Sequence, residues 1–133
     1  MSGRILLITG SRSFATHPQW EIFHLFDLIF KKFKFDPWKG DTLLVGGAPG
    51  IDMMALNYMM NKGHNYNSIY THAYDVMEAE WYKYGKAAGP IRNEAMVKKC
   101  TQGAGIWDGK SRGTKHCLDE LEKANKLLIK ITI

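Results

Sequence analysis

Two short apolar runs of this 133-residue chain each end in a turn of small and polar residues. The first run leads into TGSRS and the second into VGGAPGID. Glycine lets backbone N–H groups approach a ligand closely, and the start of a helix attracts anions. The turns therefore predict a phosphate site, although Gly-rich turns between strands and helices also form for purely steric reasons. The residues expected to contact the phosphate are Gly10, Ser11, Arg12, Gly46, Gly47, Ala48 and Gly50.

Asp52 follows the second turn, and the sequence leaves two roles open for it. Its carboxylate either complements the dipole of the helix that it opens or accepts a hydrogen bond from a ribose hydroxyl. The turn lacks the Gly-Lys-Ser/Thr end of a Walker A loop, and the chain lacks the Gly-x-Gly-x-x-Gly fingerprint. Ordinary ATPases and dehydrogenases are therefore disfavoured.

Two later segments carry further groups suited to anions. In YGKAAGPIRNEAM, small residues deliver Arg92 and Asn93 to the start of a helix, where a guanidinium can bind phosphate through two hydrogen bonds. The alternative for Arg92 is an ordinary surface arginine. In IWDGKSRGTKH, Asp108 ends a strand and donors follow at the start of a helix. These donors are Ser111, Arg112, Gly113 and Thr114.

Short β-branched runs alternate with longer amphipathic stretches, which is typical of βαβ units around a parallel sheet. We expect one domain over residues 1–133 with an α/β, three-layer Rossmann-like fold and a mainly parallel sheet of about five strands. Ligands of such sheets bind outside the carboxyl ends of the strands, where the four turns fall. The expected strands are Arg4–Thr9, Thr42–Val45, Ser68–His72, Ala104–Trp107 and Leu127–Thr132. The expected helices are Pro18–Phe35, Pro49–Asn61, Gly89–Lys99 and Thr114–Ala124.

The first expected helix has an unusually broad apolar face. We expect most of this face to pack in the hydrophobic core, but it is wider than the stripe that one sheet face usually covers. The surplus is also typical of a subunit interface, so we expect a homo-oligomer. The apolar residues of this helix are Trp20, Ile22, Phe23, Leu25, Phe26, Leu28, Ile29, Phe30 and Phe33.

Composition restricts the class of protein and of partner. Lys and Arg total 18 against 13 Asp and Glu, so the formal charge of +5 favours anionic partners. No block of like charges resembles a disordered nucleic-acid arm. The two cysteines, Cys100 and Cys117, show no zinc-binding spacing, so we expect neither a metal nor a cofactor. With no signal peptide and no membrane-length apolar run, we expect a cytoplasmic protein without a membrane partner.

Taken together, GSRSF, VGGAPGID, WYKYGKAAGPIRNEAM and WDGKSRGTKH resemble the YspA-like branch of the SLOG superfamily, in order and spacing, over nearly the whole chain. The superfamily also includes the LOG phosphoribohydrolases and the DNA-processing DprA proteins. The resemblance implies a Rossmann-like sheet, a site for nucleotides or nucleotide-derived small molecules, and frequent self-association. The ligand contacts it implies are Gly10, Ser11, Arg12, Gly46, Gly47, Gly50, Asp52, Arg92, Asn93, Ser111, Gly113 and Thr114.

One position departs from the LOG pattern. The LOG enzymes pair an arginine with a glutamate three positions after the threonine of a Gly-rich turn, and here that position holds Cys117. A thiol replaces a carboxylate poorly unless its pKa is lowered. Asp119 and Glu120 lie nearby but point elsewhere on a helix that starts at Thr114. The sequence therefore does not predict glycosidase activity of the LOG type.

The leading hypothesis is a sensor or sequestering module for a phosphorylated nucleotide derivative resembling ADP-ribose, NAD or a nucleoside monophosphate. The alternative is a hydrolase that cleaves an N-glycosidic or phosphate bond of such a ligand; Arg92 would stabilise charge, and Asp52, Glu94 or Asp108 would act as acid or base. DprA-like nucleic-acid binding ranks lowest. The aromatic residues of WYKY, from Trp81 onward, are suited to stacking on bases, but such residues more often pack over an adenine or against the core.

Overall fold

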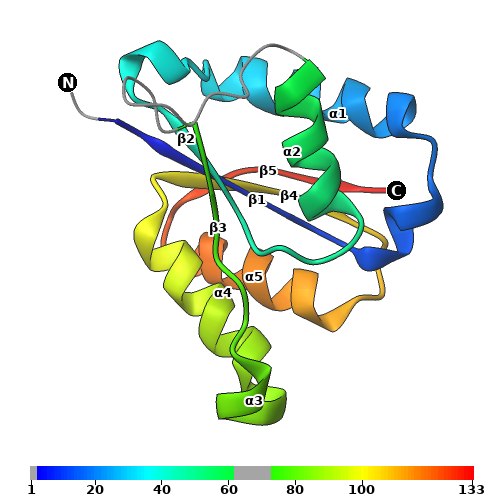
Figure 1. Cartoon of the computed structure of the whole chain (residues 1–133), viewed down its shortest axis with the longest axis vertical. Helices are drawn as coiled ribbons and strands as arrows, with labels where there is room; N and C mark the ends of the chain where they lie inside the picture. Colours follow the sequence, from blue (N-terminus) through cyan, green and yellow to red (C-terminus); the bar gives the residue numbers. More distant parts are fainter. Residues whose placement is uncertain (1–2, 62–72) are drawn as a thin grey trace.

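The computed structural model of the chain describes residues 3–61 and 73–133. It is an α/β fold with a five-stranded, all-parallel sheet in the order β3-β2-β1-β4-β5 (Figure 1). The strands are β1 (Ile5–Gly10), β2 (Thr42–Val45), β3 (Tyr74–Val76), β4 (Gln102–Trp107) and β5 (Leu127–Thr132). The α-helices are α1 (Gln19–Phe33), α2 (Ile51–Asn61), α3 (Trp81–Tyr84), α4 (Ala88–Lys99) and α5 (Arg112–Lys123). Three short 3-10 helices are η1 (Arg12–Thr16), η2 (Pro37–Lys39) and η3 (Gly85–Ala87).

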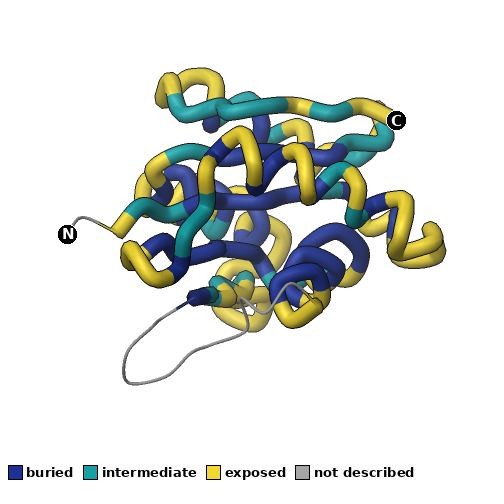
Figure 2. Tube along the Cα trace, turned by 90° about the horizontal axis from the view of Figure 1, so that it is seen from above, coloured by how far each residue is buried: buried dark blue, intermediate teal, exposed yellow. Residues whose placement is uncertain are grey.

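Helices cover both faces of the sheet, which gives the three layers of a Rossmann-like fold. Successive side chains of a strand point to opposite faces. Leu6 and Ile8 of β1 therefore join the core beneath α1 and α2, while Leu7 joins the core beneath α4 and α5. Figure 2, which views the molecule from above, shows the central strands in the dark blue of buried residues. The prediction of a three-layer Rossmann-like fold is confirmed.

Two glycines of β4 make room for leucine side chains of α5. A Cβ atom on Gly103 would come within 2.6 Å of the Leu121 side chain, and one on Gly105 within 2.5 Å of Leu118. The two leucines occupy the space that larger side chains on β4 would fill. This packing holds the second half of α5 against β4.

Most of the broad apolar face of α1 is used in the core. The buried residues are Ile22, Phe26, Ile29, Phe30 and Phe33. The aromatic rings of Phe23, Phe26 and Phe30 all lie near the buried ring of Tyr58 on α2, and this second helix is why the face is so wide. Trp20 and Leu28 stay exposed. The surplus that led us to expect an oligomer is therefore much smaller than the sequence indicates.

The boundaries of the elements differ from expectation in a few places. The strand expected at Ser68–His72 lies outside the described residues, and β3 at Tyr74–Val76 was not predicted. Helix α3 and η3 fill a segment that we expected to be a loop. No helix in the described parts of the chain combines the length and apolar character needed to cross a membrane.

Candidate functional site

A cavity of about 540 Å³ opens at the carboxyl ends of β1 and β4. In the observed strand order, the chain winds from β1 toward one edge of the sheet and then returns to β4 on the other side of β1. Ligands of open parallel sheets bind at this reversal. The predicted site residues that line the cavity are Gly10, Arg12, Ala48, Asp52, Arg92, Asn93, Ser111, Arg112, Gly113 and Thr114.

A second compartment of about 290 Å³ lies beside the first. It contains the predicted residues Gly46 and Gly47, and it shares Arg12, Ala48, Trp81 and Arg92 with the first compartment. Ser11, Gly50 and Asp108 line neither compartment. The structure thus brings most of the predicted site together around two adjoining compartments.

Ser11 and Asp108 hold the turns after β1 and β4 together instead of facing the cavity. The buried Ser11 hydroxyl accepts the Asp108 N–H at 3.1 Å and lies 3.0 Å from the Ser111 hydroxyl. Ser13 donates to the Asp108 carboxylate at 2.7 Å. These bonds connect residues about a hundred positions apart, so they fix η1 against the start of α5.

The Asp108 carboxylate is already occupied by donors from its own turn. It accepts the backbone N–H groups of Lys110 and Ser111, each at 2.8 Å. Together with the Ser13 bond, these donors lower the pKa of Asp108 to about 2. A carboxylate held in this way is a poor acid or base at neutral pH, so a catalytic role for Asp108 loses support.

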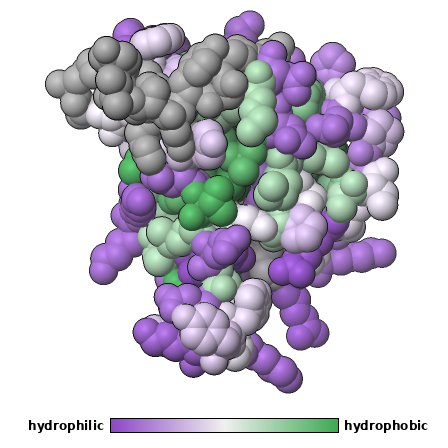
Figure 3. Space-filling view, viewed as in Figure 1, coloured by the Kyte–Doolittle hydropathy of each residue, from purple (hydrophilic) through white to green (hydrophobic). Residues whose placement is uncertain are grey.

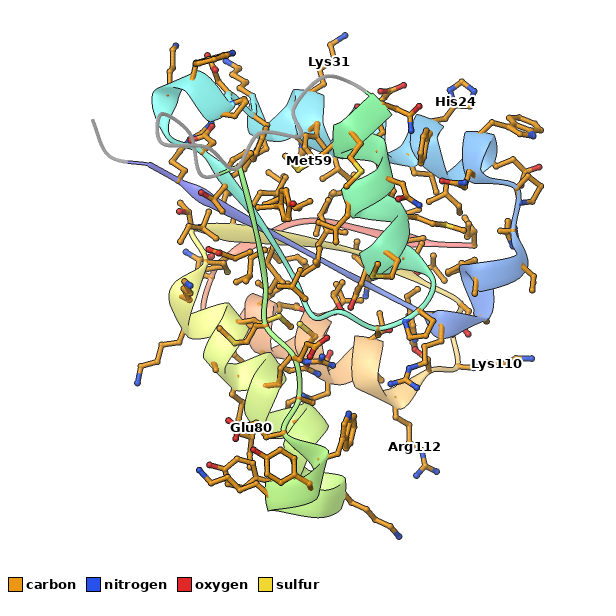
Figure 4. All side chains as sticks on the ribbon, viewed as in Figure 1. His24, Lys31, Met59, Glu80, Lys110 and Arg112 are labelled. Carbon is orange, nitrogen blue, oxygen red and sulfur yellow. The ribbon has the colours of Figure 1, made fainter. Side chains whose placement is uncertain are left out.

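The start of α5 is suited to an anion. Ser111 precedes the helix, but its side chain makes no capping bond, and the first turn carries no acidic residue. Arg112 and Gly113 are exposed, and the Arg112 side chain makes no hydrogen bond or ion pair with any other described residue. Figure 4 shows Arg112 extending outward from α5, on the opposite side of the sheet from Lys31 of α1. The start of α5 therefore offers backbone N–H groups and the positive end of the helix dipole to an anion, with the exposed Arg112 guanidinium beside them.

Arg92 and Asn93 form a bridge across the site. Helix α4 begins at Ala88, one residue before the expected start at Gly89, so Pro90 lies in its first turn and Arg92 and Asn93 follow about one turn into the helix. Arg92 donates from Nη1 to the Gly46 carbonyl at 2.6 Å and from Nε to the Asn93 side-chain oxygen at 3.1 Å. Asn93 is buried and donates to the Gly113 carbonyl at 3.1 Å. The bridge connects the turn after β2 with the first turn of α5 and orients the guanidinium.

Two glycines of the β2–α2 turn permit close approaches within the protein. A Cβ atom on Gly46 would lie 2.6 Å from Nη1 of Arg92. Gly50 has a φ of +88°, and a Cβ there would lie 2.8 Å from the Ser11 carbonyl oxygen. At Gly46 and Gly50, glycine is therefore required because a side chain would collide with neighbouring atoms. This steric requirement does not depend on whether the turn also binds a ligand.

Asp52 is a buried carboxylate at the wall of the cavity, with 5% of its surface exposed. It accepts the Ala48 N–H at 3.1 Å, which shapes the turn. Burial raises its pKa to about 6, although bonds from the Ala48 and Gly46 backbone and the nearby Arg92 act in the opposite direction. A carboxyl group that titrates near neutrality beside a guanidinium can exchange a proton with a ligand.

Comparison with known proteins places the chain in a family. The Gene 61 protein of Mycobacterium phage D29 is 30% identical over 125 residues, which cover 91% of this chain and 90% of that protein. The chain belongs to the family of the Gene 61 protein. No protein-family model and no solved structure matches it. The name of the Gene 61 protein carries no chemistry, so function must be argued from the site itself.

In this member of the Gene 61 protein's family, Cys117 is fully buried beneath the cavity. Burial raises the pKa of its thiol to about 12. A protonated, enclosed thiol is a poor nucleophile, so Cys117 packs and does not replace the glutamate of the LOG enzymes.

Six cavity residues were missing from the predicted site. Gly89 and Pro90 lie in the segment that supplied Arg92, and His116 lies one helical turn after Arg112, so helix periodicity is the signal that could have found it. For Trp81, the sequence indicates stacking on nucleic acid or adenine, or packing against the core, without placing it at the phosphate site. The missed residues are Thr9, Ser13, Trp81, Gly89, Pro90 and His116.

Glu94, His116 and Glu120 form a cluster whose possible ligand atoms lie within 4.8 Å of one another. The Asn93 amide nitrogen faces Nδ1 of His116 at 3.4 Å, and its orientation is set by Arg92 and Gly113. Nδ1 is then the acceptor, so the imidazole proton sits on Nε2, which faces Glu120 at 3.7 Å. At 3.7 Å, the contact between Nε2 and Glu120 is longer than a hydrogen bond, so it is an electrostatic contact between neighbouring side chains.

Proposed function

We propose that this protein binds a phosphorylated, nucleotide-derived small molecule in the cavity at the ends of β1 and β4, with the phosphate at the first turn of α5. The observation that carries the proposal is that three arginine residues line one cavity. These residues are Arg12, Arg92 and Arg112. The carboxylate in the described lining, Asp52, supplies one negative charge against these three positive charges.

The size and position of the cavity support a small ligand over a polymer. Its volume of about 540 Å³ lies within the range of small-molecule sites. Nucleic acid would instead be expected to follow an extended basic surface. In Figure 3, hydrophilic residues are spread around the visible face and not gathered into one stripe.

The resemblance to the YspA-like branch of the SLOG superfamily agrees with this proposal and extends it to a sensing or sequestering role. Self-association belongs to the same proposal. Trp20 and Leu28 on α1 are the exposed apolar residues available for it on that helix.

The proposal is tested by calorimetry with AMP, ADP-ribose, NAD and cyclic AMP. Arg112→Ala is the sharpest variant, because this guanidinium is exposed and its loss removes no described internal contact. Loss of a charged hydrogen-bonding partner should weaken binding roughly tenfold to a hundredfold. Arg92→Ala should weaken it at least as much, because the bridge to Gly46 is lost as well.

Lys31→Ala is the matched control, since Lys31 is an exposed cation on α1, away from the cavity. Arg4 is unsuitable as a control, because it forms an ion pair with Asp41 at 2.9 Å. Equal affinity of the Arg112→Ala and Lys31→Ala proteins would contradict the assignment of the phosphate site. Failure of every phosphorylated compound to bind, with binding of unphosphorylated ones, would overturn the proposal.

A hydrolase is the second candidate function, and Asp52 is the observation that favours it. Its pKa of about 6 suits a general acid or base, and it lies beside the Arg92 guanidinium at the cavity wall. Chromatography of nucleotides incubated with the protein should then reveal free base or inorganic phosphate. Asp52→Asn should abolish that release while binding persists.

A further inference from the structure

Trp81 occupies a distinctive place between the two compartments. It is the first residue of α3, its surface is 51% exposed, and it lines both cavities. Arg12 and Arg92 also belong to both linings. The indole ring of Trp81 therefore lies where the two compartments adjoin, and Arg12 and Arg92 line both compartments there.

The indole is supported from behind by the start of α4. Gly89 is buried, and a Cβ atom on it would lie 3.3 Å from Cη2 of Trp81. The absence of a side chain at Gly89 lets the ring lie against the helix backbone. Trp81 is thus held on one side while much of its remaining surface stays open.

The other aromatic residues of α3 differ from Trp81. Tyr82 is 93% exposed and lines neither compartment. Tyr84 lies under the Lys83 ammonium group, 5.0 Å from its ring centroid. In Figure 1, α3 lies at the end of α4, away from the sheet. The exposure of Trp81 is therefore a property of its position at the cavity, whereas that of Tyr82 reflects an outward-facing helix surface.

An open indole beside cationic groups has a specific chemical complement. Planar rings stack on indoles with a favourable free energy, and every nucleobase offers such a face. A guanidinium from the protein could also cover the ring, but the cation–π contacts found in the described parts of the chain involve Phe33 and Tyr84 instead. The Trp81 ring is left for a ligand.

We propose that Trp81 is the stacking platform for the base of the ligand, so that the protein selects phosphorylated compounds that carry a planar aromatic ring. This inference rests on the proposed function and adds a requirement to it. The base lies on the indole at the junction, the sugar spans the cavity, and the phosphate reaches the first turn of α5. Ribose 5-phosphate, which has the sugar and phosphate without the base, lacks the stacking contact.

Calorimetry with AMP, ADP-ribose and ribose 5-phosphate tests the inference on the wild-type chain and on Trp81→Leu, Trp81→Phe and Tyr82→Leu. Trp81→Leu should weaken AMP and ADP-ribose roughly fivefold to a hundredfold. Trp81→Phe should retain most of the affinity, and Tyr82→Leu all of it. The affinity for ribose 5-phosphate should not change in any variant, which also shows that the variants are folded.

Fluorescence provides a second measurement that needs no destabilising change. Trp20, Trp38 and Trp107 remain in Trp81→Phe, so AMP should quench the wild-type chain more than this variant. Equal quenching, or equal AMP affinity of the Trp81→Leu and Tyr82→Leu proteins, would overturn the stacking inference while leaving the phosphate site intact. Failure of AMP, ADP-ribose and ribose 5-phosphate alike to bind the wild-type chain would instead overturn the proposed function and this inference with it.

Discussion

The turns after β2 and β4 both present an aspartate near the same edge of the sheet, yet the two carboxylates have opposite properties. Asp52 is buried, and burial raises its pKa to about 6. Asp108 accepts bonds from the backbone of Ser111 and Lys110 and from Ser13, which lower its pKa to about 2. In the sequence both are aspartates in a glycine-containing segment that follows a strand, although Asp108 comes directly after β4 and Asp52 lies at the start of α2. Solvent exposure and the number of donors, which come only from the tertiary structure, decide what each carboxylate can do.

The largest effect is expected from Asp52→Asn. Because the folded pKa of Asp52 lies above its unfolded value of 3.8, the native state holds the extra proton between about pH 4 and pH 6. The stability contributed by protonated Asp52 is therefore lost as the pH rises through this window. Asparagine has no such loss, so the variant should gain up to about 3 kcal/mol relative to wild type between pH 4 and pH 7.

Urea denaturation of both proteins across this pH range measures the difference in the free energy of unfolding. A difference that stays constant with pH would show that Asp52 has an ordinary pKa. The comparison between the two turns would then lose its basis.

Gly50→Ala should have the next largest effect. The residue has a φ of +88° and approaches the Ser11 carbonyl, so a methyl group forces the β2–α2 turn away from η1. We expect a loss of about 1 to 3 kcal/mol of stability. Gly113→Ala is the control, because no atom lies within 4 Å of the Cβ position there. Equal melting temperatures for the two variants would show that the turn does not need this glycine.

Much of the fold was predictable from the sequence, because short runs of apolar residues mark individual strands. Parallel strands buried on both faces are continuously apolar, so β1 and β2 are visible as short runs. The edge strand β5 is only partly buried, but its leucine and isoleucine residues still mark it in the sequence. Strand β3 is a partly exposed edge strand of three residues, which is too short for any periodic signal.

The site was predictable to the extent that turns mark strand ends. Gly10, Asp52 and Arg112 all reach the cavity as expected. The sequence does not show which turn residues line the cavity and which ones hold the turns together. Ser11 and Asp108 bond to each other's turns across the sheet, and such partners can be recognised only when the strand order is known.

Cys117→Ala tests whether the buried thiol near the cavity contributes to ligand binding. The buried thiol has a pKa raised to about 12 by burial, so it supplies no charge to the ligand. We expect unchanged nucleotide affinity and a loss of about 1 kcal/mol of stability from the small cavity created. Loss of binding or turnover in a protein that remains folded would instead assign the thiol a chemical role.

The smallest effect is expected from Asp108→Asn. Because the folded pKa of Asp108 lies below its unfolded value of 3.8, its contribution to stability is present above about pH 4 and is lost as the pH falls toward 2. The variant should therefore be slightly less stable than wild type at pH 7 and equally stable near pH 2. Thermal unfolding at both pH values checks this sign, which is opposite to that of Asp52.

The most direct test of the ligand site is a titration with AMP followed by backbone amide NMR. Bound phosphate should shift the amide resonances of Arg112, Gly113 and Thr114 at the start of α5, together with that of Gly10 at the end of β1. Inorganic sulfate should shift the same α5 amides more weakly. Saturable shifts confined to the α1 face around Trp20, with the α5 amides unchanged, would contradict a phosphate site in this cavity.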